Sequence, residues 1–600
     1  MFFFIPVILA GIIAGGASLY LAKEILAVPF KKTSIAAFIL GISFQYIFQI
    51  YYIPALGFNF PQTWVSIIFA VLLSVIIAIL LNGLIFNRKK GLFESIESVF
   101  LSGIFLKIGG GFVASLFIFW AAYVVLSGEL FRSKDYRNLL GEMQKMDHIQ
   151  EVDEEHLNSI RLVPYQTAST LAAKVLGQSK DGSILGSQLS LDHYSAGIQE
   201  VNGELWWIFP LDFSGFFEWK SRTNIPGYIR VNAHDPKREA EFIDTDPANG
   251  KKLNLVYTPN SYFSSWMERI IYFQFPDHEI NHIALEVDEK WKPFYIVTLT
   301  RPSIGMSGDK ISGIIIFDPQ TGKMEFREMK DLPAWIDWAM PLDLTLDYLN
   351  WWGEYVHGWF NSIFAMRDIQ IPTYSNGVQD LWFVQVGKEN YWFTGMTSIS
   401  SADQSLVGAV FVNTRTGAPN YFTMHGTDEN GVGEAVDSAL GADSARWEPT
   451  APIPYNLLGV PSWVVPIVSS EGVYQKLAIV DMNNINTIAI DRDLNQAVEK
   501  YKFSLRRNAS RPPGELMEGV SQTGYVSVSR VGSTVTDGTK TFYIMISEKN
   551  NKVFTTNADS PKTRVAALVQ PGDKVKIQYI DSQDKIIPID SIQIQGIDLE

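Results

Sequence analysis

One stretch has the residue types and spacing of a catalytic metal site: His278-Glu279-Ile280-Asn281-His282 fits H-E-x-x-H. On a helix, this spacing places two imidazoles one turn apart, where they bind Zn²⁺ while the glutamate acts as general base of a protease. The context favours a strand instead, because Pro276 lies just before the motif and residues 282–288 alternate as a strand does. Glu286 follows too closely to be a well-placed third ligand. We therefore expect no metal ligand and no catalytic residue here, and a membrane metalloprotease is the third-ranked function.

The rest of the chain offers little catalytic chemistry. It contains no cysteine, which excludes disulfides, thiolate catalysis, iron–sulfur clusters and cysteine zinc sites. His193, His234, His357 and His425 have no partner at metal-ligand spacing. No nucleophile elbow, phosphate loop or dinucleotide fingerprint occurs. The carboxylates at 288–289 and 153–155 are more typical of turns and solvated surface than of a Ca²⁺ site. We expect no cofactor and no enzymatic activity.

The predicted structural elements begin with an apolar N-terminal part. Four stretches are long enough to cross about 30 Å of hydrocarbon as helices: Phe2–Ala22, Ser34–Leu56, Trp64–Phe86 and Ser102–Leu126. The first lacks the basic n-region and the cleavage site of a signal peptide. The sequence therefore predicts a four-helix transmembrane domain over residues 1–128.

Basic loops give this domain an orientation. Lys31 and Lys32 precede the second span, and Arg88, Lys89 and Lys90 separate the third from the fourth. Positively charged loops face the cytoplasm, so both termini and everything after Gly128 are expected outside it, in a bacterial-type cytoplasmic membrane. Lys107 lies near the cytoplasmic end of the fourth span, where it is better explained as an anchor that reaches the interface than as a transport residue. A subunit of a transport or channel assembly is the alternative function.

A strand pair recurs after the predicted membrane part. The clearest copy is Lys292–Met324, in which an aromatic strand and an apolar strand end at Asp318-Pro319-Gln320-Thr321-Gly322, a typical turn. Three further copies combine a helix-compatible stretch with similar strands, beginning near residues 165, 344 and 433. Repetition at roughly constant spacing predicts an array of similar modules.

The helix followed by a short antiparallel sheet with a D-x-x-T-G-like turn resembles the PepSY domain family of extracytoplasmic modules. The resemblance rests on FYIVTL…GIIIFDPQTGKM and YWFTGMTS…GAVFVNTRTGAPNYF, and more loosely on LWWIFPL…GYIRVNAHDP and SWVVPIV…KLAIVDMNN. It covers about residues 158–495. Membership would imply a binding, inhibitory or regulatory module without catalytic residues, often found near proteases or cell-wall enzymes.

The tail after Gly519 has several short strands with Gly-containing turns, which predict a small OB-like β-barrel. Aromatic residues among basic ones suggest single-strand nucleic-acid binding: Phe542, Tyr543 and Tyr579 with Lys540, Lys549, Lys552, Lys562, Arg564, Lys574 and Lys576. The expected location outside the cytoplasm argues against it. So does the charge, because residues after 129 carry 42 basic and 59 acidic side chains. We expect no nucleic-acid partner.

The predicted fold is thus a membrane α-helical bundle, extracytoplasmic α+β repeat modules and a C-terminal small β-barrel. The expected division is a transmembrane domain (1–128), a linker (129–157), four PepSY-like modules (158–257, 258–343, 344–428 and a degenerate 429–510) and the barrel (515–600). The aromatic excess supplies candidate interface residues, with core packing as the commoner role: Trp206, Trp207, Trp351, Trp352 and Trp359. The sequence favours a non-enzymatic scaffold or regulator that contacts membrane lipid, envelope proteins and further copies of itself.

Overall fold

The computed structural model describes most of the chain in a set of segments. They cover 4–20, 31–86, 118–146, 149, 151–152, 157, 160–177, 179–180, 183–247, 249–375, 378–379, 381–387, 389–399, 405–424, 426–507, 520–536, 539–547, 552–557, 563–580 and 585–597. The predicted topology residues Arg88, Lys89, Lys90 and Lys107 lie outside these segments. Lys31 and Lys32 begin the second helix.

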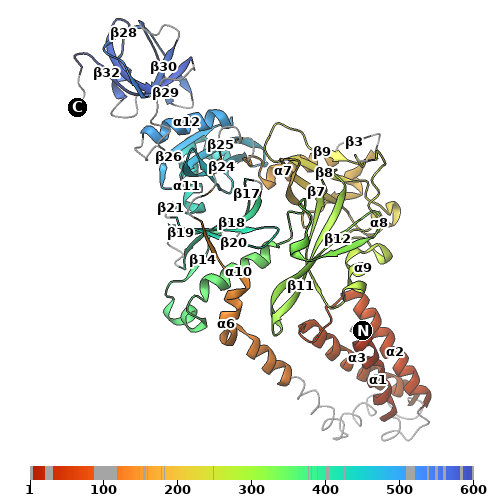
Figure 1. The fold of residues 1–600 in the computed structure, drawn as a ribbon. Helices are drawn as coiled ribbons and strands as arrows, with labels where there is room; N and C mark the ends of the chain where they lie inside the picture. The colour runs from red at the N-terminus through yellow and green to blue at the C-terminus, as the bar shows by residue number, and fades with distance from the viewer. Residues whose placement is uncertain are drawn as a thin grey trace.

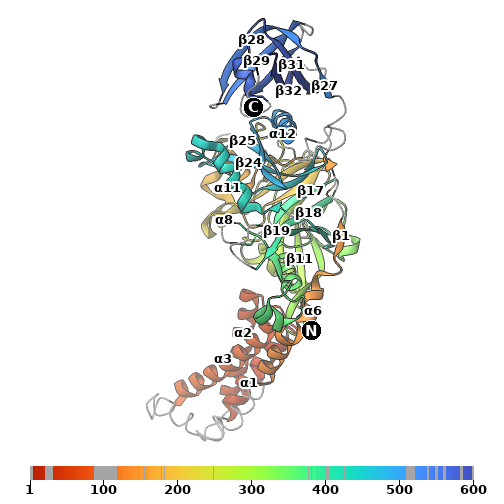
Figure 2. The same cartoon turned by 90° about the vertical axis from the view of Figure 1, so that its left-hand side faces the viewer.

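Three apolar helices pack together at the N-terminal end: α1 (Phe4–Tyr20), α2 (Lys31–Tyr52) and α3 (Pro61–Phe86). Small side chains allow the close approach, since Ala14 and Ala37 are buried between the helices and a Cβ at Gly41 would lie 2.9 Å from the Ala10 carbonyl oxygen. Figures 1 and 2 show this group below the rest of the molecule.

The predicted four-helix membrane bundle is wrong. In the described segments, one helix is long and apolar enough to cross a membrane, the Ile35–Tyr52 part of α2. The α1 helix has 17 residues, which span only about 25 Å and fall short of a full crossing. Of the predicted fourth span, only residues 118–126 are within those segments, in the short apolar helix Ile118–Ser127. Apolar composition alone does not report how long a helix is, as the 17-residue α1 shows.

The remainder is a mixed α/β protein with several antiparallel sheets (Figure 1). The first sheet follows α7 (Tyr165–Gly177) and contains β5 (Leu189–Leu191), β6 (Gly197–Val201), β7 (Glu204–Phe213), β8 (Tyr228–Asn232) and β9 (Glu241–Ile243). A short helix, α8 (Phe216–Arg222), interrupts the connection between β7 and β8. The second sheet follows α9 (Met267–Gln274) and contains β10 (Glu279–Val287), β11 (Pro293–Ile304), β12 (Ser307–Phe317) and β13 (Met324–Arg327).

The third and fourth sheets repeat this order. The third follows α10 (Leu342–Glu354) and contains β14 (Gln370–Pro372), β17 (Trp382–Val386), β18 (Glu389–Ser398), β19 (Ser405–Asn413), β20 (Pro419–Phe422) and β21 (Gly426–Thr427). The fourth lies between α11 (Glu429–Leu440) and α12 (Leu494–Arg507) and contains β22 (Trp447–Pro449), β23 (Ile453–Leu457), β24 (Val460–Ser469), β25 (Tyr474–Asp481) and β26 (Asn484–Asp491). Each of the four sheets contains an antiparallel meander of four successive strands: β6 to β9, β10 to β13, β17 to β20 and β23 to β26.

The strand pair predicted within Lys292–Met324 is confirmed. β11 and β12 pair in register from Tyr295 opposite Phe317 to Ile304 opposite Ser307. Alternate side chains enter two different cores: Tyr295 and Phe317 lie in one, and Ile296 in the other. Because both faces are covered there, residues 293–299 of β11 and 314–317 of β12 are apolar except for Thr298.

One capping interaction recurs where the third long strand of each sheet ends. The side-chain oxygen of Asn232, Asp318, Asn413 or Asp481 accepts a hydrogen bond from the backbone N–H two residues later. This bond fixes the direction of the turn and satisfies a donor that no strand pairs. In the second and third sheets the turn ends at Gly322 and Gly417, whose φ angles of 70° and 74° favour glycine.

The segment predicted as a linker takes part in two of the sheets. It begins with α6 (Glu129–Arg137) and continues into β1 (Gln144–Met146) and β2 (Glu151–Val152). β1 pairs in parallel with β20 and β2 pairs in parallel with β23. Residues next to the apolar helices are therefore hydrogen-bonded to strands near the end of the sheet array.

The tail forms a closed sheet at the far end from α1–α3, next to α12 (Figure 2). β28 (Val526–Thr536), β29 (Thr539–Ile546), β30 (Val553–Asn557), β32 (Ile586–Ile594) and β31 (Lys574–Ile580) follow one another, and β31 pairs back to β28. A further strand, β27 (Val520–Gln522), pairs with β31. Its core includes Phe542 and Tyr579, so two of the three predicted stacking aromatics are buried in the barrel.

We expect Asp318→Ala to destabilise the protein by about 1–2 kcal/mol, because it leaves backbone donors of the turn unpaired and removes the ion pair with Lys292. Asp318→Asn is the matched control, since Asn232 and Asn413 already cap the equivalent turns. Urea unfolding in detergent measures both. Equal destabilisation by the two substitutions would contradict the capping role.

Candidate functional site

The H-E-x-x-H residues do not converge on one point. His278 precedes β10, and Glu279 to Val287 form that strand. Four residues of strand span about 13 Å, far more than the separation of two zinc ligands. The Glu279 carboxylate instead accepts a hydrogen bond of 3.1 Å from Gln62 Nε2. Among the described residues, no group of three or more His, Cys, Asp or Glu side chains is placed to hold a metal ion.

Each histidine of the motif has another role. His282 stacks on Trp338 with ring centroids 5.9 Å apart, and burial lowers its pKa to about 4. His278 Nδ1 lies 3.1 Å from an Asp277 carboxylate oxygen, and burial and the nearby Arg301 lower its pKa. Both side chains are therefore neutral packing groups at pH 7.

The other described histidines also serve local contacts. His193 hydrogen-bonds the Tyr165 hydroxyl at 2.7 Å, and His357 Nε2 lies 2.7 Å from Asp368. His234 uses both ring nitrogens, accepting from Leu205 N–H and lying 3.1 Å from the Ile160 carbonyl. The remaining candidate, His425, lies outside the described residues.

The five predicted interface tryptophans serve contacts within the chain. Trp206 and Trp207 are adjacent on β7, with 2% and 6% of their surface exposed, and they enter different cores. Trp206 faces the second sheet, and Trp207 faces α7 and the third sheet. Trp351, Trp352 and Trp359 are partly covered and lie against the α6 region.

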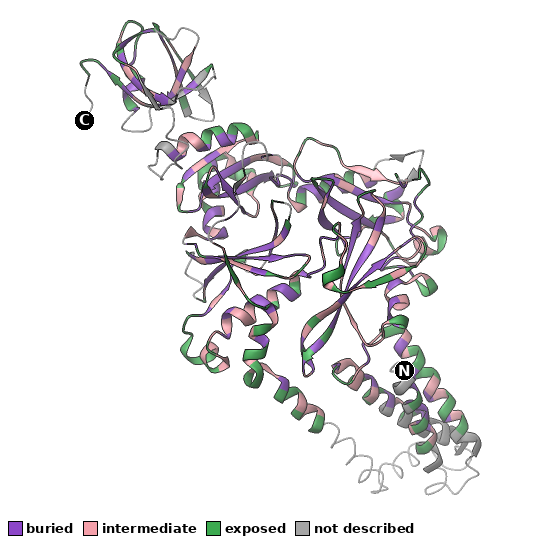
Figure 3. Ribbon diagram, viewed as in Figure 1, coloured by how far each residue is buried: buried purple, intermediate pink, exposed green. Residues whose placement is uncertain are grey.

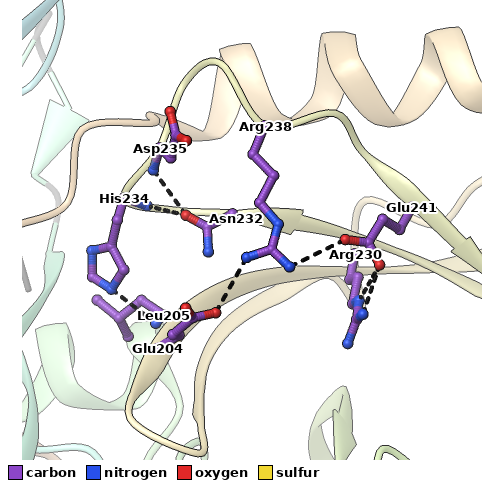
Figure 4. Close-up of polar contacts among 8 residues, drawn as sticks. All are labelled: Glu204, Leu205, Arg230, Asn232, His234, Asp235, Arg238 and Glu241. Atoms are coloured by element: carbon purple, nitrogen blue, oxygen red, sulfur yellow. Dashed lines mark hydrogen bonds and ion pairs between the residues drawn. The ribbon is translucent and has the colours of Figure 1, made fainter. Parts of the chain in front are cut away.

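Figure 4 shows a charged cluster of Glu204, Arg230, Arg238 and Glu241, whose two arginines also contact Trp206. The guanidinium groups of Arg230 and Arg238 lie 4.7 and 4.3 Å from its ring centre. Glu241 pairs with both arginines, at 2.6 Å to Arg230 and 3.4 Å to Arg238. Every charge in this cluster has a partner, so it stabilises the edge of the first sheet instead of offering a free binding group.

The most constrained polar site is where the first three sheets meet. We call Gln199, Glu286, Asp337, Trp338 and Trp392 the three-sheet junction. The Glu286 carboxylate on β10 accepts backbone hydrogen bonds from Asp337 (2.7 Å) and Trp338 (2.8 Å). The Trp338 indole donates to the Ile198 carbonyl of the first sheet at 2.6 Å, and its ring makes an edge contact with Trp392 of the third.

Two more side chains close the three-sheet junction. Gln199 of β6 bridges to the second sheet, donating to the Val287 carbonyl at 2.7 Å and accepting from Val287 N–H at 2.8 Å. The Asp337 carboxylate accepts from Glu200 N–H at 2.8 Å. These bonds satisfy backbone groups that no strand pairs, so the segment between β13 and α10 holds three sheets in one arrangement.

The two buried carboxyl groups of the three-sheet junction titrate unusually. Burial, and then the proximity of Asp337, raise the pKa of Glu286 to about 8, against the opposing effect of its backbone hydrogen bonds. Burial likewise raises the pKa of Asp337 to about 7, while its hydrogen bonds to Glu200 and Asn390 oppose the shift. Arg415 is the nearby positive charge. The junction is therefore most favourable when these groups hold protons.

Two concavities lie outside the three-sheet junction. One of about 480 Å³ separates the ends of α2 and α3 from the second sheet and is lined mainly by apolar groups, with His278 and Glu279 at its wall. The other, about 450 Å³, is ringed by turns containing Asp246, Asp288 and Asp318 and by lysines. Asp318 is paired with Lys292, and both Asp288 and Asp318 cap their own turns. Neither concavity brings together groups for catalysis.

An aromatic cluster that the sequence analysis missed lies on α8 and the following surface. Phe217 is 77% exposed and Phe263 is 62% exposed, beside Phe216, Trp219 and Tyr262. The ring centres of Phe216 and Tyr262 are 5.2 Å apart, and those of Trp219 and Phe263 are 5.8 Å apart. We call these five residues the α8 patch. The signal in the sequence was the run Phe216-Phe217-Glu218-Trp219, which is equally typical of a buried segment.

No protein-family model, curated protein or solved structure matches this chain.

We expect the stability of the protein to fall as pH rises from about 5 to 9. The folded-state pKa values of Glu286 and Asp337 lie above the usual carboxyl values, so the folded state binds more protons across this range and stability is lost with rising pH. Over this pH range, the unfolding free energy of Glu286→Gln should fall by a few kcal/mol less than that of the wild type. Urea unfolding at several pH values measures it, with Asp331→Asn on the surface as control. An identical pH profile for Glu286→Gln and wild type would contradict this account.

We also expect no stoichiometric zinc. Full-length protein incubated with Zn²⁺ and desalted should retain as little metal as His278→Ala, because the motif spans a strand. Elemental analysis by mass spectrometry measures the ratio of zinc to protein. One zinc per chain that is lost in His278→Ala would overturn this reading.

Proposed function

We propose that this protein is a non-enzymatic, membrane-anchored scaffold or regulator of a cell-envelope complex. Its four sheets with their helices, which we call the sheet body, bind protein partners. The α8 patch is the observation that supports this function best. Large aromatic side chains exposed together are costly in water and are enriched at the centres of protein interfaces. The ring contacts within the patch hold Phe217 and Phe263 in position, so little conformational entropy is lost when a partner covers them.

The apolar α2 helix supports anchoring in a membrane. Ile35, Ile39, Phe44 and Ile47 all expose more than a third of their surface, unlike the side chains of a buried core helix (Figure 3). The helix begins at Lys31-Lys32, and positive charge favours the cytoplasmic side. The opposite end leads to Leu56, whose N–H donates to the Pro276 carbonyl of the sheet body at 2.6 Å. This orientation places the sheet body outside the cytoplasm of a bacterial-type cell.

The repeated meanders support a binding role as well. We propose that the four sheets are PepSY-like modules, in keeping with the helix that precedes each meander and with the shared turn caps. Such modules bind and regulate other proteins without catalytic residues. Proteins of the cell envelope, or a second copy of this chain, are the partners that fit an extracytoplasmic aromatic surface.

Photo-crosslinking from the α8 patch tests this function. A benzoylphenylalanine at position 217, in full-length protein in its native membrane, should give discrete products whose mass identifies an envelope protein or a second copy. Glu239, also exposed, is the control position. Adding Phe263→Ser should reduce the yield from position 217 at least threefold while leaving the unfolding midpoint unchanged, because a polar residue at an exposed site costs little stability. Absence of products, or equal products from position 239, would overturn the proposal.

A further inference from the structure

The turn after α10 presents a second set of exposed apolar side chains. Phe360 and Phe364 are 65% and 74% exposed, and Ile363 and Met366 are also exposed. The two phenylalanine rings lie side by side, with centroids 6.3 Å apart and planes within 16°. Four large apolar groups within seven residues make this the most apolar short surface segment of the sheet body.

The backbone holds this turn in a defined shape. Residues Asn361–Ala365 form one turn of π-helix, and Met366 N–H donates to the Asn361 carbonyl at 2.7 Å. The Asn361 side chain closes the loop, donating to the Arg367 carbonyl and accepting from Arg367 N–H. The preceding Trp359 packs with Tyr136, Ile304 and Tyr355. The phenylalanines are thus presented to the surroundings by a fixed support.

The position of the turn relates it to the apolar N-terminal part. A Cβ at Gly358 would lie 3.7 Å from Ser133 Oγ, so the turn lies beside α6. The α6 helix follows directly on the apolar helix Ile118–Ser127, which exposes Val125 and Leu126. Figures 1 and 2 both show the segment after α10 next to α6, at the end of the sheet body nearest α1–α3.

A second contact places the loop after α2 beside the apolar helix that precedes α6. Tyr123 OH lies 3.4 Å from Asn59 Oδ1, in the loop that follows α2, and its ring makes an edge contact with Phe58. Aromatic residues of this kind gather at the interface between hydrocarbon and water. The outer end of α2 and the start of α6 therefore lie at one level, close to the apolar turn.

We propose that the turn Phe360–Met366 inserts into the outer interfacial layer of the bilayer that holds α2. Phe360, Ile363, Phe364 and Met366 enter the boundary between headgroups and acyl chains, while the exposed Arg367 meets lipid phosphate. The exposed apolar side chains of Leu126, Leu130 and Phe131, at the start of α6 and just before it, favour lipid over a second protein copy. This inference rests on the membrane anchoring proposed above.

The absence of cysteine allows a direct test with single labelled sites. Phe364→Cys in the full chain carries an environment-sensitive nitrobenzoxadiazole dye, and the protein is reconstituted into phosphatidylcholine–phosphatidylglycerol vesicles. Flotation of the protein with the vesicles measures membrane anchoring separately from insertion of the turn. Phe217→Cys, which is equally exposed on the α8 patch, is the matched control.

We expect blue-shifted emission at position 364 and quenching by lipids with a doxyl group near the top of the acyl chain, at least threefold stronger than at position 217. Phe360→Ser with Ile363→Ser should weaken the quenching while flotation persists. Flotation with no quenching at position 364 would overturn the insertion and leave the anchor intact. A blue shift without lipid quenching, and dependent on protein density, would assign the turn to a second copy and also overturn it.

Discussion

The arrangement of the sheets depends on one buried carboxylate. Glu286 receives two backbone hydrogen bonds from the segment that leaves the second sheet for the third, and this fixes Trp338 between β6, β10 and β18. A charge in this position is costly to bury, so the neutral form is favoured and the segment retains its partners. Without this contact, the first three sheets would share apolar faces but would lack a defined relative orientation. Buried polar groups commonly supply such uniqueness in a core that apolar packing alone leaves degenerate.

Burial on both faces explains the composition of the central strands. β7 carries Trp206 and Trp207 in succession because each faces a different neighbouring sheet. The third and fourth sheets share a further core, to which Phe393 and Trp463 contribute. A meander with a single covered face would alternate polar and apolar residues, whereas these strands contain continuous apolar runs such as residues 205–211 of β7. The faces of the sheets are therefore largely covered, and the exposed aromatic rings Phe217 and Phe263 lie on short helical segments at the surface.

Sequence patterns located the local elements well and the contacts between them poorly. The β11–β12 pair was predictable because apolar periodicity and the Asp318 turn are local signals. The helix-compatible stretch that begins near residue 344 forms a helix only as far as Glu354, since Gly353 packs against the Gln370 carbonyl and Gly358 adopts a φ of 84°. Glu286 was considered only as a third zinc ligand, and its burial could not be predicted because a glutamate in an alternating strand is typical of a solvent-facing position. The exposure of Phe217 and Phe364 could not be predicted either, since composition cannot tell an aromatic residue of the core from one on the surface.

The pairing of β1 and β2 has a consequence for the biosynthesis of the chain. Both strands leave the ribosome early, yet their partners β20 and β23 are made only after the first two sheets are complete. Strands β1 and β2 must therefore wait without these hydrogen bonds while several hundred further residues are synthesised. Such distant pairing makes the final pairing of these strands slow, because a long intervening segment must be ordered before the new hydrogen bonds contribute stability. A nascent chain halted before Phe422 would therefore leave β1 without its pairing strand.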